Sequence, residues 1–127
     1  MCNIGFILTL KKKMESKELR IGNLLNDRDG NLCKVFELGK NSILAPALNK
    51  PTTKLPNEPI PLTEEWLLKF GFEYTKLYYI KYDDDLIIYF DGIDFYFKRS
   101  SKSLTIKYVH QLQNLYFALT GEELNPL

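Results

Sequence analysis

The chain has 127 residues, of which 45% are hydrophobic, 13% aromatic and 26% charged. This length and composition suffice for one hydrophobic core of ordinary size and indicate a single soluble domain. With 17 basic and 16 acidic residues the formal charge is +1, which excludes a strongly basic nucleic-acid binder and an acidic polynucleotide mimic at the level of the whole chain. Any charge-driven function must therefore be local.

The first thirteen residues read as an extension. Residues 4–10 form an apolar run that is much shorter than the ~20 residues of a membrane-spanning helix. Three lysines follow this run, whereas a secretory signal places its positive charge before the apolar stretch. We therefore expect Met14 to be a functional start, residues 1–13 to lie outside the fold and residues 14–127 to form one domain.

The N-terminal half predicts short strands followed by an extended connection. Residues 19–25 and 32–38 flank an Asp-Gly turn signal, which predicts a β-hairpin of ambiguous register, and residues 42–45 predict a short extra strand. Five of the six prolines then lie within residues 46–61. This stretch is either an extended surface connection or a linker between two small lobes. Whether the hairpin joins a later sheet or forms a small barrel of its own stays open.

A short helix follows, with signals at both ends. Thr63 can cap its N-terminus, and two glutamates place negative charge in the first turn. Gly71 suits the left-handed position after the helix, which lets Phe72 return to it in a Schellman arrangement. We predict a two-turn helix over residues 64–70.

Residues 73–99 predict a three-stranded antiparallel meander. A two-residue turn at Asp91 and Gly92 places apolar pairs on one face, and a three-residue turn over residues 83–85 extends that face. The expected core face is Tyr78, Ile80, Tyr82, Leu86, Ile88, Phe90, Ile93, Phe95 and Phe97. By alternation, tyrosine and lysine occupy the other face, with Tyr79, Lys81, Tyr89, Tyr96 and Lys98.

The last predicted element is an amphipathic helix over residues 108–120, ended by Gly121. Its expected core face is Tyr108, Val109, Leu112, Leu115, Tyr116 and Leu119. The opposite side carries His110, Gln113, Asn114 and Phe117, so we expect the Phe117 ring to point away from the core. The elements together predict an α+β fold: an antiparallel β-hairpin and a three-stranded meander with one short helix and one longer C-terminal helix.

No pattern typical of a catalytic or metal site is present. His110 has no acidic, Cys or His residue three or four positions away, and Cys33 lacks a CxxC partner and predicts a small buried side chain. The aspartates over residues 83–85 lack calcium-loop spacing, and the basic segment over residues 98–103 predicts a solvated loop rather than a phosphate site. The GxxxxGK[ST], GxGxxG, GxSxG and HExxH motifs do not occur. We expect no enzymatic activity, cofactor, metal or small-molecule substrate.

The tyrosine and lysine face of the meander has three interpretations. Aromatics beside lysines are typical of a platform on which single-stranded nucleic acid stacks, at roughly 1–3 kcal/mol per base. Tyrosine is also a common anchor of protein interfaces. In the third interpretation another element covers this face and the tyrosines belong to the core. The candidate partner-binding residues are Tyr79, Lys81, Tyr89, Tyr96, Lys98, Arg99 and Phe117.

Three sequence blocks resemble a family of small accessory proteins of phages and prophages. They are ELRIGNLL at 18–25, EPIPLTEEWLLKFGF at 58–72 and IKYVHQLQNLYFALTGEEL at 106–124, together about a third of the chain. The last two blocks are long enough to be specific, whereas the meander lies where such proteins differ most. Members of the family begin near MxxxELRIGN, in agreement with a start at Met14.

This resemblance implies a binding protein. The chain is similar in size and character to anti-CRISPR proteins directed at a type VI-B RNA-guided ribonuclease. The implied function is inhibition of that host nuclease, by binding the effector and disturbing its guide-RNA assembly or activity in the bacterial cytoplasm. The alternatives are a single-stranded nucleic-acid-binding module and a phage regulatory protein of another kind.

Overall fold

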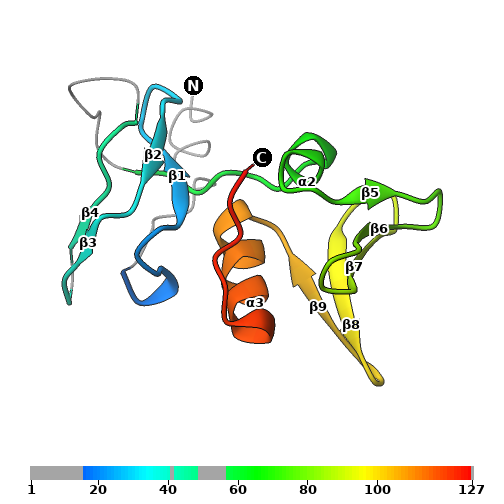
Figure 1. The fold of residues 1–127 in the computed structure, drawn as a ribbon. Helices are drawn as coiled ribbons and strands as arrows, with labels where there is room; N and C mark the ends of the chain where they lie inside the picture. Colours follow the sequence, from blue (N-terminus) through cyan, green and yellow to red (C-terminus); the bar gives the residue numbers. More distant parts are fainter. Residues whose placement is uncertain (1–15, 41, 49–56, 127) are drawn as a thin grey trace, which may run out of the picture. The chain divides into compact units, whose positions relative to one another are not determined.

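The computed structural model describes residues 16–40, 42–48 and 57–126 (Figure 1). It divides into two compact units, Met1–Pro59 and Ile60–Leu127. Antiparallel sheets combined with helices confirm the predicted α+β class. The expected extension over residues 1–13 and the middle of the proline-rich connection lie outside the described residues. Within the described part, no helix has the length and apolarity needed to cross a membrane.

The first unit contains two short hairpins, each a two-stranded sheet of its own. A 3-10 helix, η1 (Ser16–Glu18), comes first. β1 (Leu24–Asn26) then pairs with β2 (Leu32–Lys34), and β3 (Glu37–Leu38) pairs with β4 (Ile43–Leu44). The predicted hairpin and extra strand are therefore present, in shorter form than the sequence suggested. Among the described residues, the strands of these hairpins and those of the later five-stranded sheet form separate sheets.

Asp27 shapes the first hairpin turn. Its carboxylate accepts hydrogen bonds from the backbone amides of Asp29 and Asn31, both at 2.9 Å, while Gly30 takes a left-handed φ of +84°. Behind the turn, burial and, secondarily, the charge of Asp27 raise the pKa of the Cys33 thiol. Cys33 is thus buried, as predicted. The core of this unit is Leu19, Leu25, Cys33, Val35, Ala45 and Ala47.

The second unit begins with α2 (Glu64–Lys69), which confirms the predicted short helix and its caps. The Thr63 hydroxyl accepts a hydrogen bond from the Trp66 amide at 3.4 Å. At the other end Gly71 has a φ of +93°, and the Phe72 amide donates to the Leu67 carbonyl at 3.0 Å. The helix therefore ends in the predicted Schellman arrangement.

A five-stranded antiparallel sheet follows, with its strands adjacent in chain order. The strands are β5 (Glu73–Tyr74), β6 (Tyr78–Lys81), β7 (Leu86–Phe90), β8 (Phe95–Arg99) and β9 (Lys102–Ile106). The predicted meander forms the three central strands, and β5 and β9 add one strand at each edge.

The strand β9 corrects the prediction that residues 98–103 form a loop. Arg99 pairs directly with Lys102, so only Ser100 and Ser101 lie in the turn. Ser100, the first central residue of the turn, takes a left-handed φ of +56°, as that position does in the two-residue turns favoured in hairpins. The absence of glycine or asparagine there hid this turn from the sequence.

The register between β7 and β8 differs from the prediction by two residues. The turn spans four residues, 91–94, so Phe90 pairs with Phe95 rather than with Ile93. A shift of two leaves every strand side chain on its predicted face, because successive residues alternate. Two residues of the expected core are exposed at this end of the hairpin: Ile93, at the tip of the turn, and Phe90, beside it.

The register between β6 and β7 is shifted by one residue, which reverses the faces of β6. Lys81 pairs with Leu86 and Tyr79 with Ile88, because the turn uses four residues and Asp85 takes a left-handed φ of +54°. The prediction that Tyr79 and Lys81 share a face with Tyr89 is therefore wrong. The face directed toward the helices carries Tyr79, Lys81, Leu86, Ile88, Phe90, Phe95 and Phe97.

The C-terminal helix α3 (Val109–Thr120) contacts β9 and ends at Gly121, which has a φ of +77°. Val109, Leu112 and Tyr116 are buried, as predicted. Gln113 and His110 are buried as well, contrary to the expected solvent-facing side. The chain after Gly121 turns back along α3 (Figure 1), and the Gln113 side chain donates to the Leu124 carbonyl at 3.2 Å. Leu119, an expected core residue, is exposed.

Candidate protein-binding groove

A groove of about 560 Å³ lies at the end of the sheet where the β5–β6 and β7–β8 turns project, next to the start of α2. We refer to it as the groove. Its apolar lining comes from both turns, from the adjoining strands and from Leu62 before α2, and includes Tyr74, Leu77, Tyr78, Tyr79, Phe90, Ile93 and Phe95. Its polar lining includes Thr63, Glu64 and Lys76. This composition is typical of a site that buries apolar groups and orients them with a few polar ones.

Two branched aliphatic side chains are strongly exposed at the groove. Ile93 is 84% exposed and Leu77 is 78% exposed, and each comes from a different turn. The aromatic rings of Tyr74 and Phe90, also exposed, lie in the same lining. Single exposed apolar residues are ordinary, whereas a contiguous group of this kind marks an interaction site.

Asp91 holds the β7–β8 turn in a defined shape. One oxygen of its carboxylate accepts hydrogen bonds from the amides of Ile93 and Asp94, at 2.9 and 2.8 Å. These hydrogen bonds, that from Asp94 first, lower the pKa of the Asp91 carboxyl. Gly92 has a φ of +96°, with open space where a side chain would point. The turn thus presents Ile93 outward in a fixed direction.

Thr75 performs the same task in the β5–β6 turn. Its amide and its hydroxyl both donate to the Tyr78 carbonyl, at 2.9 and 3.0 Å. Lys76 takes a left-handed φ of +79°, and its carbonyl accepts a hydrogen bond from the Tyr74 hydroxyl at 3.4 Å. Leu77 therefore lies on a turn with several internal hydrogen bonds.

Tyr79 forms the floor of the groove and connects the sheet to α2. Its hydroxyl donates to the Glu64 carboxylate at 2.5 Å, and its ring contacts Tyr74 and Phe95 at centroid separations of 5.0 and 6.0 Å. Burial raises the pKa of Tyr79 above its ordinary value, and the Glu64 carboxylate adds to the effect. The phenol stays neutral and continues to donate at physiological pH.

The opposite face of the sheet carries a row of three tyrosines, Tyr78, Tyr89 and Tyr96, which we call the tyrosine row. Tyr89 and Tyr96 are stacked at 5.6 Å, and Tyr78 meets Tyr89 edge-on at 5.8 Å. The Lys98 ammonium lies 5.2 Å from the Tyr89 ring centroid. Three predicted residues, Tyr89, Tyr96 and Lys98, thus come together here, joined by Tyr78, which was expected in the core.

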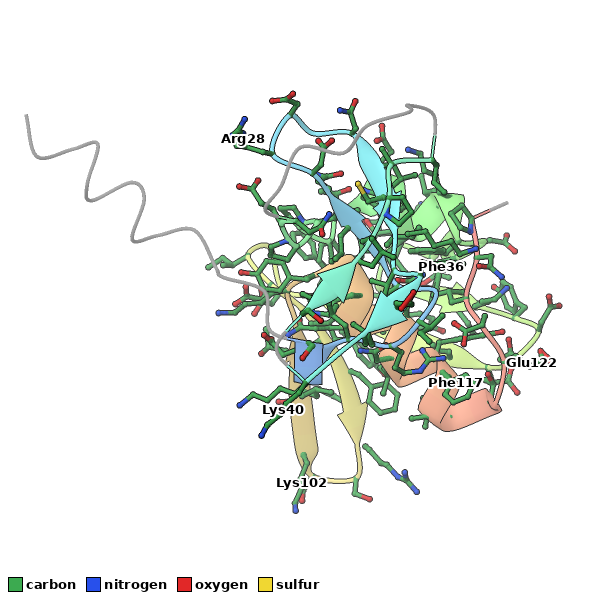
Figure 2. The ribbon with its side chains drawn as sticks, turned by 90° about the vertical axis from the view of Figure 1, so that its left-hand side faces the viewer. Arg28, Phe36, Lys40, Lys102, Phe117 and Glu122 are labelled. Atoms are coloured by element: carbon green, nitrogen blue, oxygen red, sulfur yellow. The ribbon has the colours of Figure 1, made fainter. Side chains whose placement is uncertain are left out.

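The other predicted site residues lie elsewhere. Lys81 is on the helix-facing side of the sheet, with its ammonium 5.9 Å from the Tyr116 ring centroid. Arg99 is at the end of β8, beside the β8–β9 turn. Phe117 lies on the surface of α3, as predicted (Figure 2). Across the described residues, no group of three or more Cys, His, Asp or Glu side chains is arranged to hold a metal ion.

The sequence interpretation missed the groove because it assigned Ile93 to the core and left Leu77 without a role. In an Asx turn, the side chain of an aspartate accepts hydrogen bonds from the backbone amides two and three residues later. Applied to Asp91, this pattern excludes Ile93 from the strand. Ile93 then lies in the turn with its side chain exposed, and this is the signal that could have located the site.

Searches of protein-family models, of curated proteins and of solved structures found no match to this chain.

Proposed function

We propose that this chain is a small, non-catalytic binding protein whose groove receives apolar side chains of a partner protein. We further propose that the partner is a type VI-B RNA-guided ribonuclease, whose guide-RNA assembly or activity the chain disturbs. The observation that carries the first statement is the exposure of Leu77 and Ile93 on two internally hydrogen-bonded turns. The second statement rests on the three sequence blocks that resemble phage accessory proteins.

Fixed turns favour binding because little conformational entropy is lost when a partner arrives. The order of the turn at Asp91 is supplied by its own hydrogen bonds, so the partner does not have to impose it. Each exposed aliphatic side chain then contributes burial energy of about 0.8 kcal/mol per methylene group. Ile93 and Leu77 therefore act as anchors, while Glu64 and Lys76 in the lining supply polar complementarity.

The tyrosine row supports protein contact more than base stacking. Tyr89 has the Tyr96 ring on one side and the Tyr78 ring on the other. A nucleic-acid base that stacked on Tyr89 would have to displace one of these neighbours, whereas stacking platforms offer free ring faces. The hydroxyl ends and edges of the rings suit a second area of protein interface.

A binding experiment with purified components tests this function. Immobilised full chain is incubated with type VI-B effectors, each with and without guide RNA, and cleavage of a reporter RNA is measured in parallel. We expect retention of an effector in at least one condition and reduced cleavage. No retention in either condition contradicts the proposed partner. Retention that requires RNA and disappears after ribonuclease treatment favours the nucleic-acid-binding alternative.

A further inference from the structure

The outer hairpin of the sheet, formed by β8 and β9, separates from the other strands. Pairing between β7 and β8 ends at Tyr89 and Tyr96, whereas pairing between β8 and β9 continues to Arg99 and Lys102. Figure 1 shows the resulting two-stranded ribbon extending past the rest of the sheet. Every residue from 98 to 105 is exposed. We call residues 98–105 the β-arm.

The β-arm is basic although the whole chain is almost neutral. It carries Lys98, Arg99 and Lys102, and residues 95–107 contain no aspartate or glutamate. Figure 2 shows Lys102 near the far end of the ribbon. Among the described residues, no carboxylate lies within ion-pair distance of Arg99 or Lys102. The carboxylate of Asp84, in the β6–β7 turn, has a different partner, because it accepts a hydrogen bond from the Tyr116 hydroxyl of α3.

The placement of two of these charges opposes the stability of the hairpin. Arg99 and Lys102 are directly opposite each other, and like charges in such a pair destabilise a sheet. The residues between them are Ser100 and Ser101, whose small hydroxyl side chains leave room for an approaching group and can donate hydrogen bonds to it. A polyanion bound at the tip relieves the repulsion between Arg99 and Lys102. It accepts hydrogen bonds both from these cationic side chains and from the serine hydroxyls.

We infer that the β-arm binds the phosphodiester backbone of nucleic acid. Two-stranded β-ribbons have the width to enter a groove of a duplex, and phosphate contacts depend on arginine, lysine and hydroxyl donors of the kind found here. This contact with nucleic acid does not involve the protein-binding groove described above, and it does not require the proposed partner protein. Three cations give weak affinity without sequence preference, which suits a protein that meets RNA only when the RNA is held nearby.

Salt dependence supplies a quantitative expectation. Three phosphate contacts predict that log K falls with log salt concentration with a slope of about −2 for a single strand and about −2.7 for a duplex. Between 50 and 200 mM salt the affinity then falls about 20- to 40-fold. Removal of two of the three cations leaves a slope no steeper than about −1.

The test is fluorescence anisotropy of labelled 16-nucleotide RNA, the corresponding RNA duplex and a DNA duplex, titrated with the full chain. The variant R99Q/K102Q is compared with K40Q/K69Q, which removes the same charge from exposed lysines elsewhere. We expect R99Q/K102Q to weaken binding at 50 mM salt at least about tenfold, and K40Q/K69Q to change it less than about twofold. Circular dichroism verifies that both variants are folded.

Several results overturn this inference: absent binding, equal loss in the two variants, or affinity that does not change with salt. Competition by polyglutamate as effective as that by RNA also overturns it, because the β-arm is then a site for acidic proteins. Binding to both RNA and DNA supports backbone recognition, and a preference for RNA supports an added contact with the 2′-hydroxyl. Because this titration contains no partner protein, failure of the β-arm to bind nucleic acid leaves the proposed function of the protein-binding groove unaffected.

Discussion

Replacing Ile93 by alanine separates binding from folding at the groove. The side chain is 84% exposed, so its loss removes almost no contact within the protein, and we expect the free energy of unfolding to change by less than about 0.5 kcal/mol. The three carbons that are lost are nearly all available to a partner. At about 0.8 kcal/mol per buried carbon group, complete burial of this end of the side chain contributes about 2.4 kcal/mol.

This energy corresponds to a dissociation constant about 50-fold higher, because 1.4 kcal/mol corresponds to a factor of ten. The assay is isothermal titration calorimetry of the effector with the wild-type chain and with Ile93→Ala, together with thermal melts of both proteins. Leu77→Ala, on the other turn, has an expected effect of the same order, since that side chain is 78% exposed.

Leu119→Ala is the matched control. It removes the same number of carbons from an exposed position on α3, outside the groove, and we expect it to change the dissociation constant by less than about twofold. Equal affinity of Ile93→Ala and the wild-type chain for the effector refutes the assignment of Ile93 as an anchor. A large fall in the melting temperature of Ile93→Ala refutes the inference that its side chain has no structural role.

Three further predictions concern the fold. Thr63→Ala removes the N-terminal cap of α2 and should cost about 1 kcal/mol, seen as a fall of about 4–8 °C in melting temperature, whereas Thr63→Ser should preserve stability. Burial, with the hydrogen bond to Asp84, raises the pKa of Tyr116 from 10.0 to about 12; the associated stability is complete below pH 10 and is lost as the pH rises to 12. The melting temperature of the wild-type chain should therefore fall more steeply between pH 10 and 12 than that of Tyr116→Phe, and parallel curves contradict this. In a Cys2→Ser background, no thiol should react rapidly with Ellman's reagent in the native state and one should react in denaturant, because Cys33 is buried with a raised pKa.

Elements with local signals could be predicted from the sequence. The helix α2 has its capping hydroxyl at Thr63 and its left-handed glycine at Gly71, within a few residues of its ends. The end of α3 at Gly121 was predictable for the same reason. These signals act over one or two turns of backbone and do not depend on distant packing.

The faces of the strands were predictable only where errors in turn length cancelled. A two-residue turn and a four-residue turn at Asp91 give the same faces, so Phe90 and Phe95 were assigned correctly. A three-residue and a four-residue turn before Leu86 give opposite faces, and Tyr79 was consequently assigned to the wrong one. The sequence offers three successive aspartates in that turn and no glycine that marks which residue is left-handed.

Contacts between segments far apart in the chain account for the remaining differences. Gln113 is buried with its side chain bonded to the carbonyl of Leu124, a partner that helical periodicity does not reveal. The floor of the groove likewise depends on Tyr79 reaching Glu64 of α2. Of the predicted site residues only Tyr79 lines the groove, and its two aliphatic anchors, Leu77 and Ile93, were not among them.

The most direct test of the central claim is hydrogen–deuterium exchange of the full chain, free and in complex with a type VI-B effector. We predict that protection on binding is concentrated in residues 74–79 and 90–95, which form the two turns and the adjoining strands of the groove. Slower exchange of these amides, with little change in residues 24–34 of the first unit, supports the groove as the binding surface. Unchanged exchange at both turns in a saturated complex contradicts it.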